Sequence, residues 1–202
     1  MGLDRDADMT DEHQNTDQPV KEESLGRKLL GLLLMIFVCF GIVLLITQFV
    51  LQRNTVIGVS MSPTLEDHDE VFVEKITRLF PNGIGRGDIV TADSHHVLGE
   101  RDETVIIKRV IGLPGERVAI RGGQVFIDGV LLEEPYLEEG LMTYEHVAEY
   151  AVVELGEDEY YLMGDNRTKS RDSRDIGPIS RKDIEGRLLV RFYPLDKIGK
   201  PR

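Results

Sequence analysis

The sequence has little from which disulfides, metal sites or nucleic-acid contacts could be built. Its 202 residues include one cysteine, Cys39, so no disulfide can form within the chain. Acidic residues outnumber basic ones by 36 to 24, which gives a net charge of −12. A nucleic-acid-binding surface needs a basic patch, so we expect no nucleic acid among the partners. The only adjacent histidine pair, His95-His96, has no Cys or His at ligand spacing nearby, and we expect neither a metal nor another cofactor.

The longest apolar run predicts a single transmembrane helix. Residues 29–51 contain no charged side chain, and about 23 residues at a rise of 1.5 Å reach roughly 35 Å, enough to cross a hydrocarbon core of ~30 Å. A cleavable signal peptide would have a shorter apolar core with small residues after it, and residues 48–54 offer no such site. A buried core helix is rarely apolar on all faces over this length.

The residues around this span predict its orientation. Residues 1–28 are polar and acidic without apolar periodicity, which predicts a disordered tail. Lys21, Arg27 and Lys28 precede the span, while only Arg53 follows it closely. Because Lys and Arg favour the cytoplasmic side, we expect a cytoplasmic tail and an extracytoplasmic domain. The protein would then lie in the plasma membrane, with the lipid bilayer as a partner.

Residues 52–202 predict a mainly β domain. Gly-Gly at 122–123 and Asp-Gly at 128–129 separate alternating runs, as is typical of hairpins. No long amphipathic helix follows the span, so we expect an antiparallel β-sheet or barrel that curls to protect its edges. The acidic segment 133–159 fits a peripheral insertion or long loop. The expected strands are at 71–73, 89–90, 105–112, 117–121, 124–127, 130–132, 160–163 and 188–193.

A turn soon after the span is the first candidate for chemistry. Residues 58–65 read GVSMSPTL, with Ser60 and Ser62 close together and Pro63 fixing the backbone behind them. A rigid turn can hold a hydroxyl in place, which a nucleophile requires because a displacement of ~1 Å is costly. Taken alone, the stretch fits an ordinary polar turn better, since short serine motifs often match by chance.

Lys108 is the second candidate because it interrupts an aliphatic strand. Strand alternation places Ile106 and Val110 on its face, so we expect an amine in apolar surroundings with a pKa below the usual ~10.4. Lowering a pKa by three units costs about 4 kcal/mol, which a general base needs and a structural lysine does not. A lysine on an edge strand, with its amine reaching water, explains the pattern equally well.

The third candidate is the loop 164–174, GDNRTKSRDSR. Its Gly, Asn and Ser residues favour turns and bonds between side chain and backbone. A charged surface loop is the other interpretation, since exposed ion pairs contribute little. The high density of polar and charged residues between two apolar strands favours an ordered functional site. Four side chains can pair within it and stiffen it: Asp165, Arg167, Asp172 and Arg174.

Together, these stretches resemble a known family. The stretches SMSPTL at 60–65, GDIV at 87–90, KRVIGLPG at 108–115 and the loop 164–174 are similar to the four motifs of the bacterial type I signal peptidases. They stand in the same order behind a membrane anchor, and the resemblance covers about residues 28–195. It implies a membrane-anchored serine endopeptidase that uses a Ser-Lys dyad, without a cofactor, to remove signal peptides from secretory precursor proteins.

The resemblance also implies the roles of single residues. Ser60 matches the family's nucleophile, and Lys108 matches its general base. Ser170 matches the serine that orients the lysine amine. The supporting ion pair of the family corresponds to Asp172 and Arg174, with Asp165 and Arg167 in the same motif.

The precursor is expected to bind as an extended strand beside Ser60. Shallow apolar pockets would admit only small side chains at the first and third positions before the cut. Some family members carry a serine two residues before the nucleophile that helps to hold the oxyanion, and this chain has Gly58 there. The Ser60 N–H would then supply more of that stabilisation, since losing a side-chain donor can cost ~10²–10³ in rate. The expected substrate-binding residues are Ile57, Gly58, Met61, Leu65 and Ile106.

Two other functions remain open at this point. A Ser-Lys protease of the self-cleaving SOS-repressor type has a related β fold, but that class is cytosolic and carries an N-terminal DNA-binding domain. The apolar span and the acidic tail argue against it. A non-catalytic, membrane-anchored β module could keep the motifs as a scaffold, although a scaffold has no need of Ser60, Lys108 and Ser170 together.

Overall fold

The computed structural model of the chain describes residues 25–94 and 105–201, which fall into two compact units, residues 1–42 and 43–202. Most of the expected tail and the pair His95-His96 lie outside the described residues. Helix α1 spans Leu25–Phe49. It is the one described helix long and apolar enough to cross a membrane. Its large apolar side chains are exposed, as expected of a surface that contacts lipid.

The bounds of α1 differ from those expected. The helix begins at Leu25 rather than at residue 29, since Arg27 and Lys28 are good helix formers and the helical turns continue through Gly26. It ends at Phe49 rather than at residue 51. The next residues are drawn into a sheet, where Leu51 pairs with Glu74.

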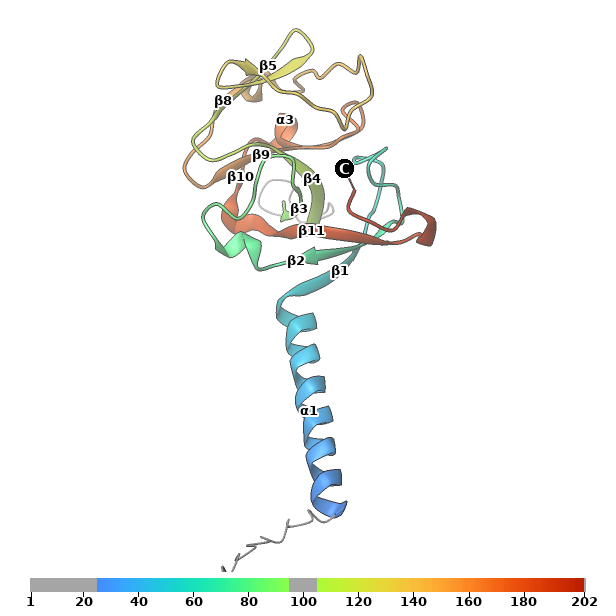
Figure 1. The fold of residues 1–202 in the computed structure, drawn as a ribbon. Coiled ribbons are helices and arrows are strands. Elements are labelled where there is room, and N and C mark those ends of the chain that lie inside the picture. The colour runs from blue at the N-terminus through green and yellow to red at the C-terminus, as the bar shows by residue number, and fades with distance from the viewer. Residues whose placement is uncertain (1–24, 95–104, 202) are drawn as a thin grey trace, which may run out of the picture. The chain divides into compact units, whose positions relative to one another are not determined.

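Most of residues 43–202 belong to two antiparallel sheets (Figure 1). The larger sheet has the order β1-β2-β11-β3-β4-β9-β10. Its strands are β1 (Leu51–Thr55), β2 (Glu70–Glu74), β3 (Ile89–Asp93), β4 (Val105–Gly112), β9 (Glu159–Met163), β10 (Ile179–Ser180) and β11 (Ile184–Tyr193).

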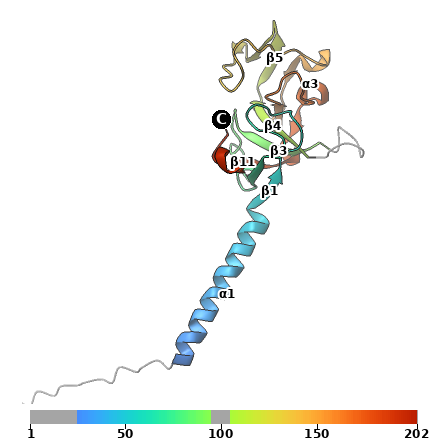
Figure 2. The same ribbon diagram turned by 90° about the vertical axis from the view of Figure 1, so that its right-hand side faces the viewer.

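The smaller sheet has the order β7-β6-β5-β8 and lies at the end of the domain away from β1 (Figures 1 and 2). Its strands are β5 (Arg117–Arg121), β6 (Gln124–Ile127), β7 (Val130–Leu131) and β8 (Val152–Glu154). The described helices of the domain are short: η1 (Thr77–Leu79), η2 (Ala148–Tyr150), α3 (Ser173–Ile176), η3 (Arg181–Asp183) and η4 (Leu195–Lys197).

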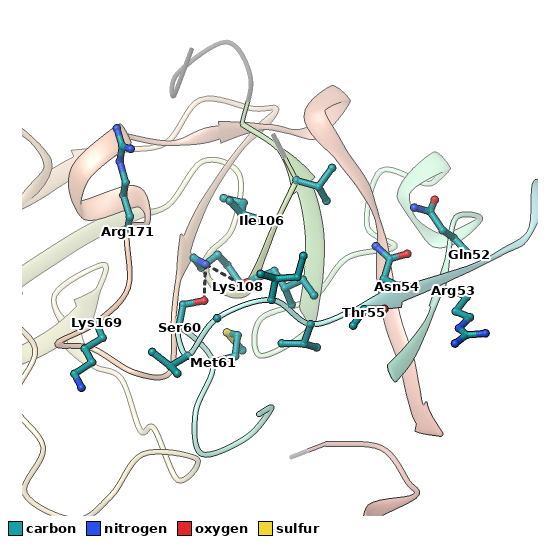
Figure 3. Close-up of a pocket in the computed structure, with 16 residues that line it drawn as sticks. Gln52, Arg53, Asn54, Thr55, Ser60, Met61, Ile106, Lys108, Lys169 and Arg171 are labelled. Carbon is teal, nitrogen blue, oxygen red and sulfur yellow. Dashed lines mark hydrogen bonds between the residues drawn. The ribbon is translucent and has the colours of Figure 1, made fainter. Parts of the chain in front are cut away.

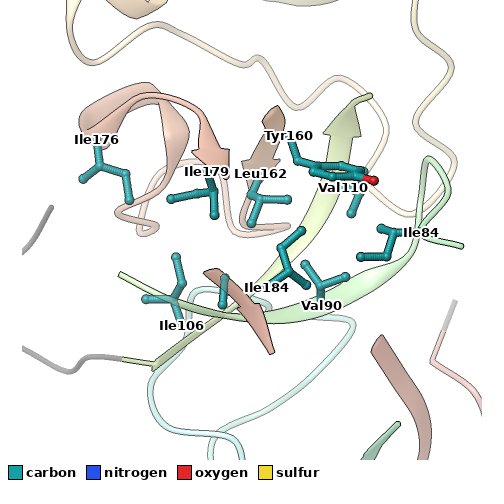
Figure 4. Packing of buried hydrophobic residues seen from close by; sticks show 10 residues of the cluster. Ile84, Val90, Ile106, Val110, Tyr160, Leu162, Ile176, Ile179 and Ile184 are labelled. Carbon is teal, nitrogen blue, oxygen red and sulfur yellow. The ribbon is translucent and has the colours of Figure 1, made fainter. Parts of the chain in front are cut away.

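The larger sheet curls around an apolar core. Strand β11 shifts register twice against β2 and once against β3, and such bulges bend a strand and increase its twist. Side chains from β3, β4, β9 and β11 therefore converge inside the curl (Figure 4). Val90, Val110, Leu162 and Ile184 are all fully buried there. This core fixes the strand that carries Lys108.

The mainly β prediction is confirmed, and each expected strand coincides with an observed one or lies largely within it. Strands β1, β8 and β10 were not expected, because each is short and takes its stability from a neighbouring strand. Residues 133–159, expected to form a peripheral insertion or long loop, are not a loop throughout. This stretch contains η2 and β8, which pairs with β5, and it buries Thr143 and Leu155.

Candidate active site

The turn that carries Ser60 is held from both sides. Gly58 has a φ of 82°, a left-handed conformation that favours glycine, and its N–H donates to Asp67 Oδ1 (2.8 Å). On the other side, the Leu65 N–H donates to the Met61 carbonyl oxygen (2.9 Å). The side chains of Met61 and Leu65 are both buried. Ser60 is thus fixed in a partly exposed turn.

Lys108 lies beside Ser60 although it comes from the middle of β4. Its Nζ donates to Ser60 Oγ (2.9 Å) and to the Ile107 carbonyl oxygen (2.9 Å) (Figure 3). Lys108 is 4% exposed, and Ile106 and Val110 on the same face of the strand are buried. Of the two interpretations left open by the sequence, the structure supports the buried amine.

Ser60 and Lys108 lie in a cleft of about 690 Å³ (Figure 3). Its walls come from the segment 52–61, the start of β4 and the loop 164–174. The expected substrate-binding residues Ile57, Gly58, Met61 and Ile106 line this cleft. Leu65 does not line it and is fully buried in the core cluster behind Met61. Among the described residues, no group of three or more His, Cys, Asp or Glu side chains could hold a metal ion.

The second serine of the turn is bound elsewhere. Ser62 Oγ donates to Glu66 Oε2 (2.9 Å).

The Ser60 N–H has no hydrogen-bond partner among the described residues. It is therefore available as a hydrogen-bond donor, and its expected role toward an oxyanion stays a prediction.

The loop 164–174 is a buried structure and not a solvated surface loop. Asp172 is fully buried and accepts hydrogen bonds from the Gly164 N–H (2.9 Å) and from Arg174 Nε (2.9 Å) and Nη2 (2.8 Å). Burial raises the pKa of Asp172, but the hydrogen bond and positive charge of Arg174 outweigh this effect and hold the pKa below its usual range. Asp172 is also the N-cap of α3.

The prediction that the four charged residues of the loop pair with one another is only half right. Asp172 does pair with Arg174 (2.8 Å). Asp165 instead accepts two hydrogen bonds from Arg109, from Nε (2.8 Å) and Nη2 (2.6 Å). Arg109 follows Lys108 in β4 and Asp165 belongs to the loop, so this buried pair ties the loop to β4. The pairing of Asp165 with Arg109 was not predicted, although Arg109 follows Lys108 in the same motif.

Arg167 pairs with a residue far away in the sequence. Its Nη1 donates to Glu134 Oε2 (3.1 Å), and it also contacts Thr143. The Val147 N–H donates to the Arg174 carbonyl oxygen (3.1 Å). Residues 134–147, which we term the clamp segment, thus hold the loop 164–174 from outside. No local signal in the sequence indicates this role.

Ser170 lies between the loop and the serine turn. A β-carbon at Gly164 would collide with Ser170 Oγ and with the Ser60 carbonyl oxygen, so the close approach requires glycine. The Asn166 N–H donates to that same carbonyl oxygen (3.0 Å). Ser170 Oγ is buried and has no hydrogen-bond partner among the described residues. Its expected role in orienting Lys108 remains a prediction.

Comparison with known proteins extends this picture. Residues 29–193 match the family described as signal peptidase, peptidase S26. Signal peptidase I from Bacillus licheniformis is 36% identical over 82% of this chain and 89% of its own length. Signal peptidase I from Leptolyngbya laminosa is 37% identical over 91% of this chain and 85% of its own length.

A solved structure of a signal peptidase I from Enterococcus faecalis is also similar. It is 31% identical and covers 52% of this chain and 97% of its own chain, with a TM-score of 0.42. The assignment to a family rests on the sequence matches, which extend over most of the chain. On these matches, the chain belongs to the signal peptidase family, peptidase S26.

Proposed function

We propose that this chain is a membrane-anchored serine endopeptidase that removes signal peptides from secretory precursors, with Ser60 as nucleophile and Lys108 as general base. One observation carries the proposal: Lys108 Nζ lies 2.9 Å from Ser60 Oγ in an open cleft, while the lysine itself is buried. This distance permits direct proton transfer between the two groups. The relatives named above are signal peptidases I, which accords with this activity.

The reaction would proceed in two stages. In the first, neutral Lys108 takes the proton of Ser60, and Oγ forms a bond to the carbonyl carbon of the last signal-peptide residue. The Ser60 N–H would hold the oxyanion. When the C–N bond breaks, the leaving amine takes the proton back from Lys108. In the second stage, Lys108 deprotonates a water molecule that hydrolyses the acyl-enzyme and regenerates Ser60.

Other parts of the chain would support this reaction. Asp172 and Arg174, together with Asp165 and Arg167, would hold the loop that places Ser170 near Lys108. The part of the precursor before the cut would lie along residues 56–59 and the start of β4. There, Ile57, Gly58, Met61 and Ile106 would form shallow pockets, with Leu65 as a buried support.

The proposed location follows from the same residues. Helix α1 would cross the plasma membrane once, and residues 52–202 would lie outside the cytoplasm. Arg27 and Lys28 near the start of the helix, and Lys21 before it, would keep the N-terminus in the cytoplasm. The anchor would hold the cleft near the membrane to which precursors are also tethered.

The direct test is cleavage of a secretory precursor by the purified full-length protein in detergent. Ser60→Ala should abolish cleavage while the protein stays folded, because the change removes one oxygen atom from a turn. Ser62→Ala is the matched control and should retain substantial activity. A wild-type protein that binds precursors without cleaving them would instead be the non-catalytic β module, and an active Ser60→Ala variant would exclude Ser60 as nucleophile.

A further inference from the structure

The peptide unit between Val59 and Ser60 has one end bound and one end open. Its oxygen, the Val59 carbonyl, accepts hydrogen bonds from Asn166 Nδ2 (3.1 Å) and from the Ser62 N–H (3.2 Å). Its nitrogen, the Ser60 N–H, has no hydrogen-bond partner among the described residues. A carbonyl oxygen has two lone pairs, so this oxygen is fully used within the fold, while the N–H is left for another molecule.

Asn166 holds the serine turn with both its backbone and its side chain. The backbone N–H donates to the Ser60 carbonyl oxygen (3.0 Å), a bond that any residue other than proline could form. The side chain adds the bond to the Val59 carbonyl, and the amide nitrogen must face this oxygen because a carbonyl oxygen only accepts. Thr168 Oγ1 donates to the other end of the amide, Asn166 Oδ1 (3.2 Å). The amide is thus held in one orientation.

An anchored carbonyl oxygen also sets the direction of the N–H in the same peptide unit. The Val59–Ser60 bond is trans, and in a planar trans unit the N–H and C=O bonds point in opposite directions. Val59 and Ser60 line the cleft, whereas Asn166 does not. The bond from Asn166 therefore turns the Ser60 N–H away from itself. Hydrogen bonds on the oxygen also polarise the unit, which makes the N–H a stronger donor.

This chain depends strongly on the direction of that one N–H. Gly58 has no hydroxyl to offer, so the oxyanion expected at Ser60 has one main-chain donor in place of a donor pair. Losing an oxyanion donor costs about 10²–10³ in rate, and a displacement of ~1 Å is costly as well. A contact that aims the remaining donor therefore bears directly on the rate.

We propose that Asn166 is a positioning residue of the reaction, whose side-chain amide aims the Ser60 N–H at the oxyanion through the Val59–Ser60 peptide unit. The amide does not touch the precursor. It acts on the transition state, in which the negative charge develops, and not on precursor binding. This inference rests on the proposed function, because it assumes that Ser60 attacks a peptide carbonyl.

The test compares full-length wild type, Asn166→Ala and Asn166→Asp on one precursor in detergent, with kcat and KM measured separately. Both variants keep the backbone bond to Ser60 and lose the amide donor. Aspartate has the shape of asparagine, but its carboxylate only accepts and would repel the Val59 carbonyl oxygen. Asn82→Ala is the matched control, because Asn82 is an exposed asparagine outside the cleft. Thermal unfolding checks that each variant is folded.

In Asn166→Ala, kcat should fall by about tenfold to a hundredfold, somewhat less than the loss of a whole oxyanion donor. KM should change by less than about twofold, as for an interaction made only in the transition state. Asn166→Asp should lose at least as much, and Asn82→Ala should match wild type. The pH at which the rate is half-maximal should stay in place, because Lys108 contacts Ser60 Oγ and not this amide.

A pair of inhibitors separates aiming of the N–H from support of the turn. A peptide aldehyde forms a bond with Ser60 Oγ and places its oxygen where the oxyanion would form, whereas the corresponding peptide alcohol cannot form this bond. Asn166→Ala should bind the aldehyde more weakly by about the factor lost in kcat. It should bind the alcohol as well as wild type does.

Several results would overturn the inference. Full kcat in Asn166→Ala would overturn it and leave the proposed function intact. A raised KM, weaker binding of the alcohol, or a shifted pH dependence would show that Asn166 only supports the turn. If Asn166→Ala does not fold, Asn166→Asp decides by the same measurements. If wild type cleaves no precursor at all, the proposed function fails and the inference fails with it.

Discussion

Arg167 and Glu134 form a buried ion pair although 33 residues separate them in the chain. The side chain of Arg167 is 1% exposed and that of Glu134 is 11% exposed. Burial lowers the pKa of Arg167, but the hydrogen bond and charge of Glu134 outweigh it and raise the pKa above its usual value. The pair joins the clamp segment to the loop that bears Ser170.

Glu134→Gln should therefore lower both stability and activity. Removing the charge of one partner leaves the guanidinium of Arg167 buried without a counter-ion, at a cost on the order of 3 kcal/mol. Urea unfolding and precursor cleavage measure the two effects. Glu133→Gln makes the same change at an exposed neighbour and should alter stability by less than ~0.5 kcal/mol. Equal effects of the two substitutions would show that the clamp segment does not act through this pair.

Ser170→Ala should reduce activity without reducing stability. Ser170 Oγ has no hydrogen-bond partner of normal geometry among the described residues, although it helps to lower the pKa of the neighbouring Asp172 carboxyl. Its removal should therefore cost the resting fold little. If Ser170 orients Lys108 during the reaction, kcat should fall while the thermal unfolding temperature stays unchanged.

The matched contrast is Ser173→Ala. Ser173 Oγ accepts the Leu162 N–H (2.9 Å) in the buried core, and losing this acceptor should cost about 1–3 kcal/mol of stability. A Ser170→Ala variant with full activity would exclude the orienting role.

Acid should weaken the fold through Asp172. Its pKa in the folded protein lies below the reference value of 3.8. The ionised carboxylate therefore adds stability above that pH, and the contribution is lost as the pH falls through the folded-state pKa. Asp172→Asn should be less stable than wild type at pH 7, with a smaller difference near pH ~3. A difference in unfolding free energy that stays constant with pH would contradict this account.

The cleft also predicts which signal peptides are cleaved. Ile57 is 64% exposed and Met61 is 1% exposed, so the wall beside Ser60 is shallow and backed by fixed side chains. A larger side chain would have to displace that packing, which usually costs about 1–3 kcal/mol. Precursors with Ala at the first and third positions before the cut should be cleaved, and those with Phe or Lys at the first should not. Comparable rates across this panel would rule out the pocket assignment.

The motifs and the strand pattern of the sequence were enough to predict the larger part of the fold and the centre of the site. Strand alternation placed Lys108 on the face of Ile106 and Val110 but left a buried amine and one that reaches water equally open, and the fold decides for burial. The helix bounds and the short strands could not be predicted, since Leu51 and Val152 take their conformation from partner strands. The role of Glu134 could not be predicted for the same reason, because only the folded chain brings this residue to Arg167.

The central claim, that Lys108 is the base for Ser60, is tested most directly by cleavage rate against pH. Wild type, Lys108→Arg and a variant with all five histidines replaced by Asn or Gln are compared on one precursor. The wild-type rate should rise with pH as the amine loses its proton, and the histidine-free variant should follow the same curve. Lys108→Arg should be inactive at every pH, because a guanidinium keeps its proton. Substantial activity in Lys108→Arg, or a pH dependence that disappears with the histidines, would contradict the account.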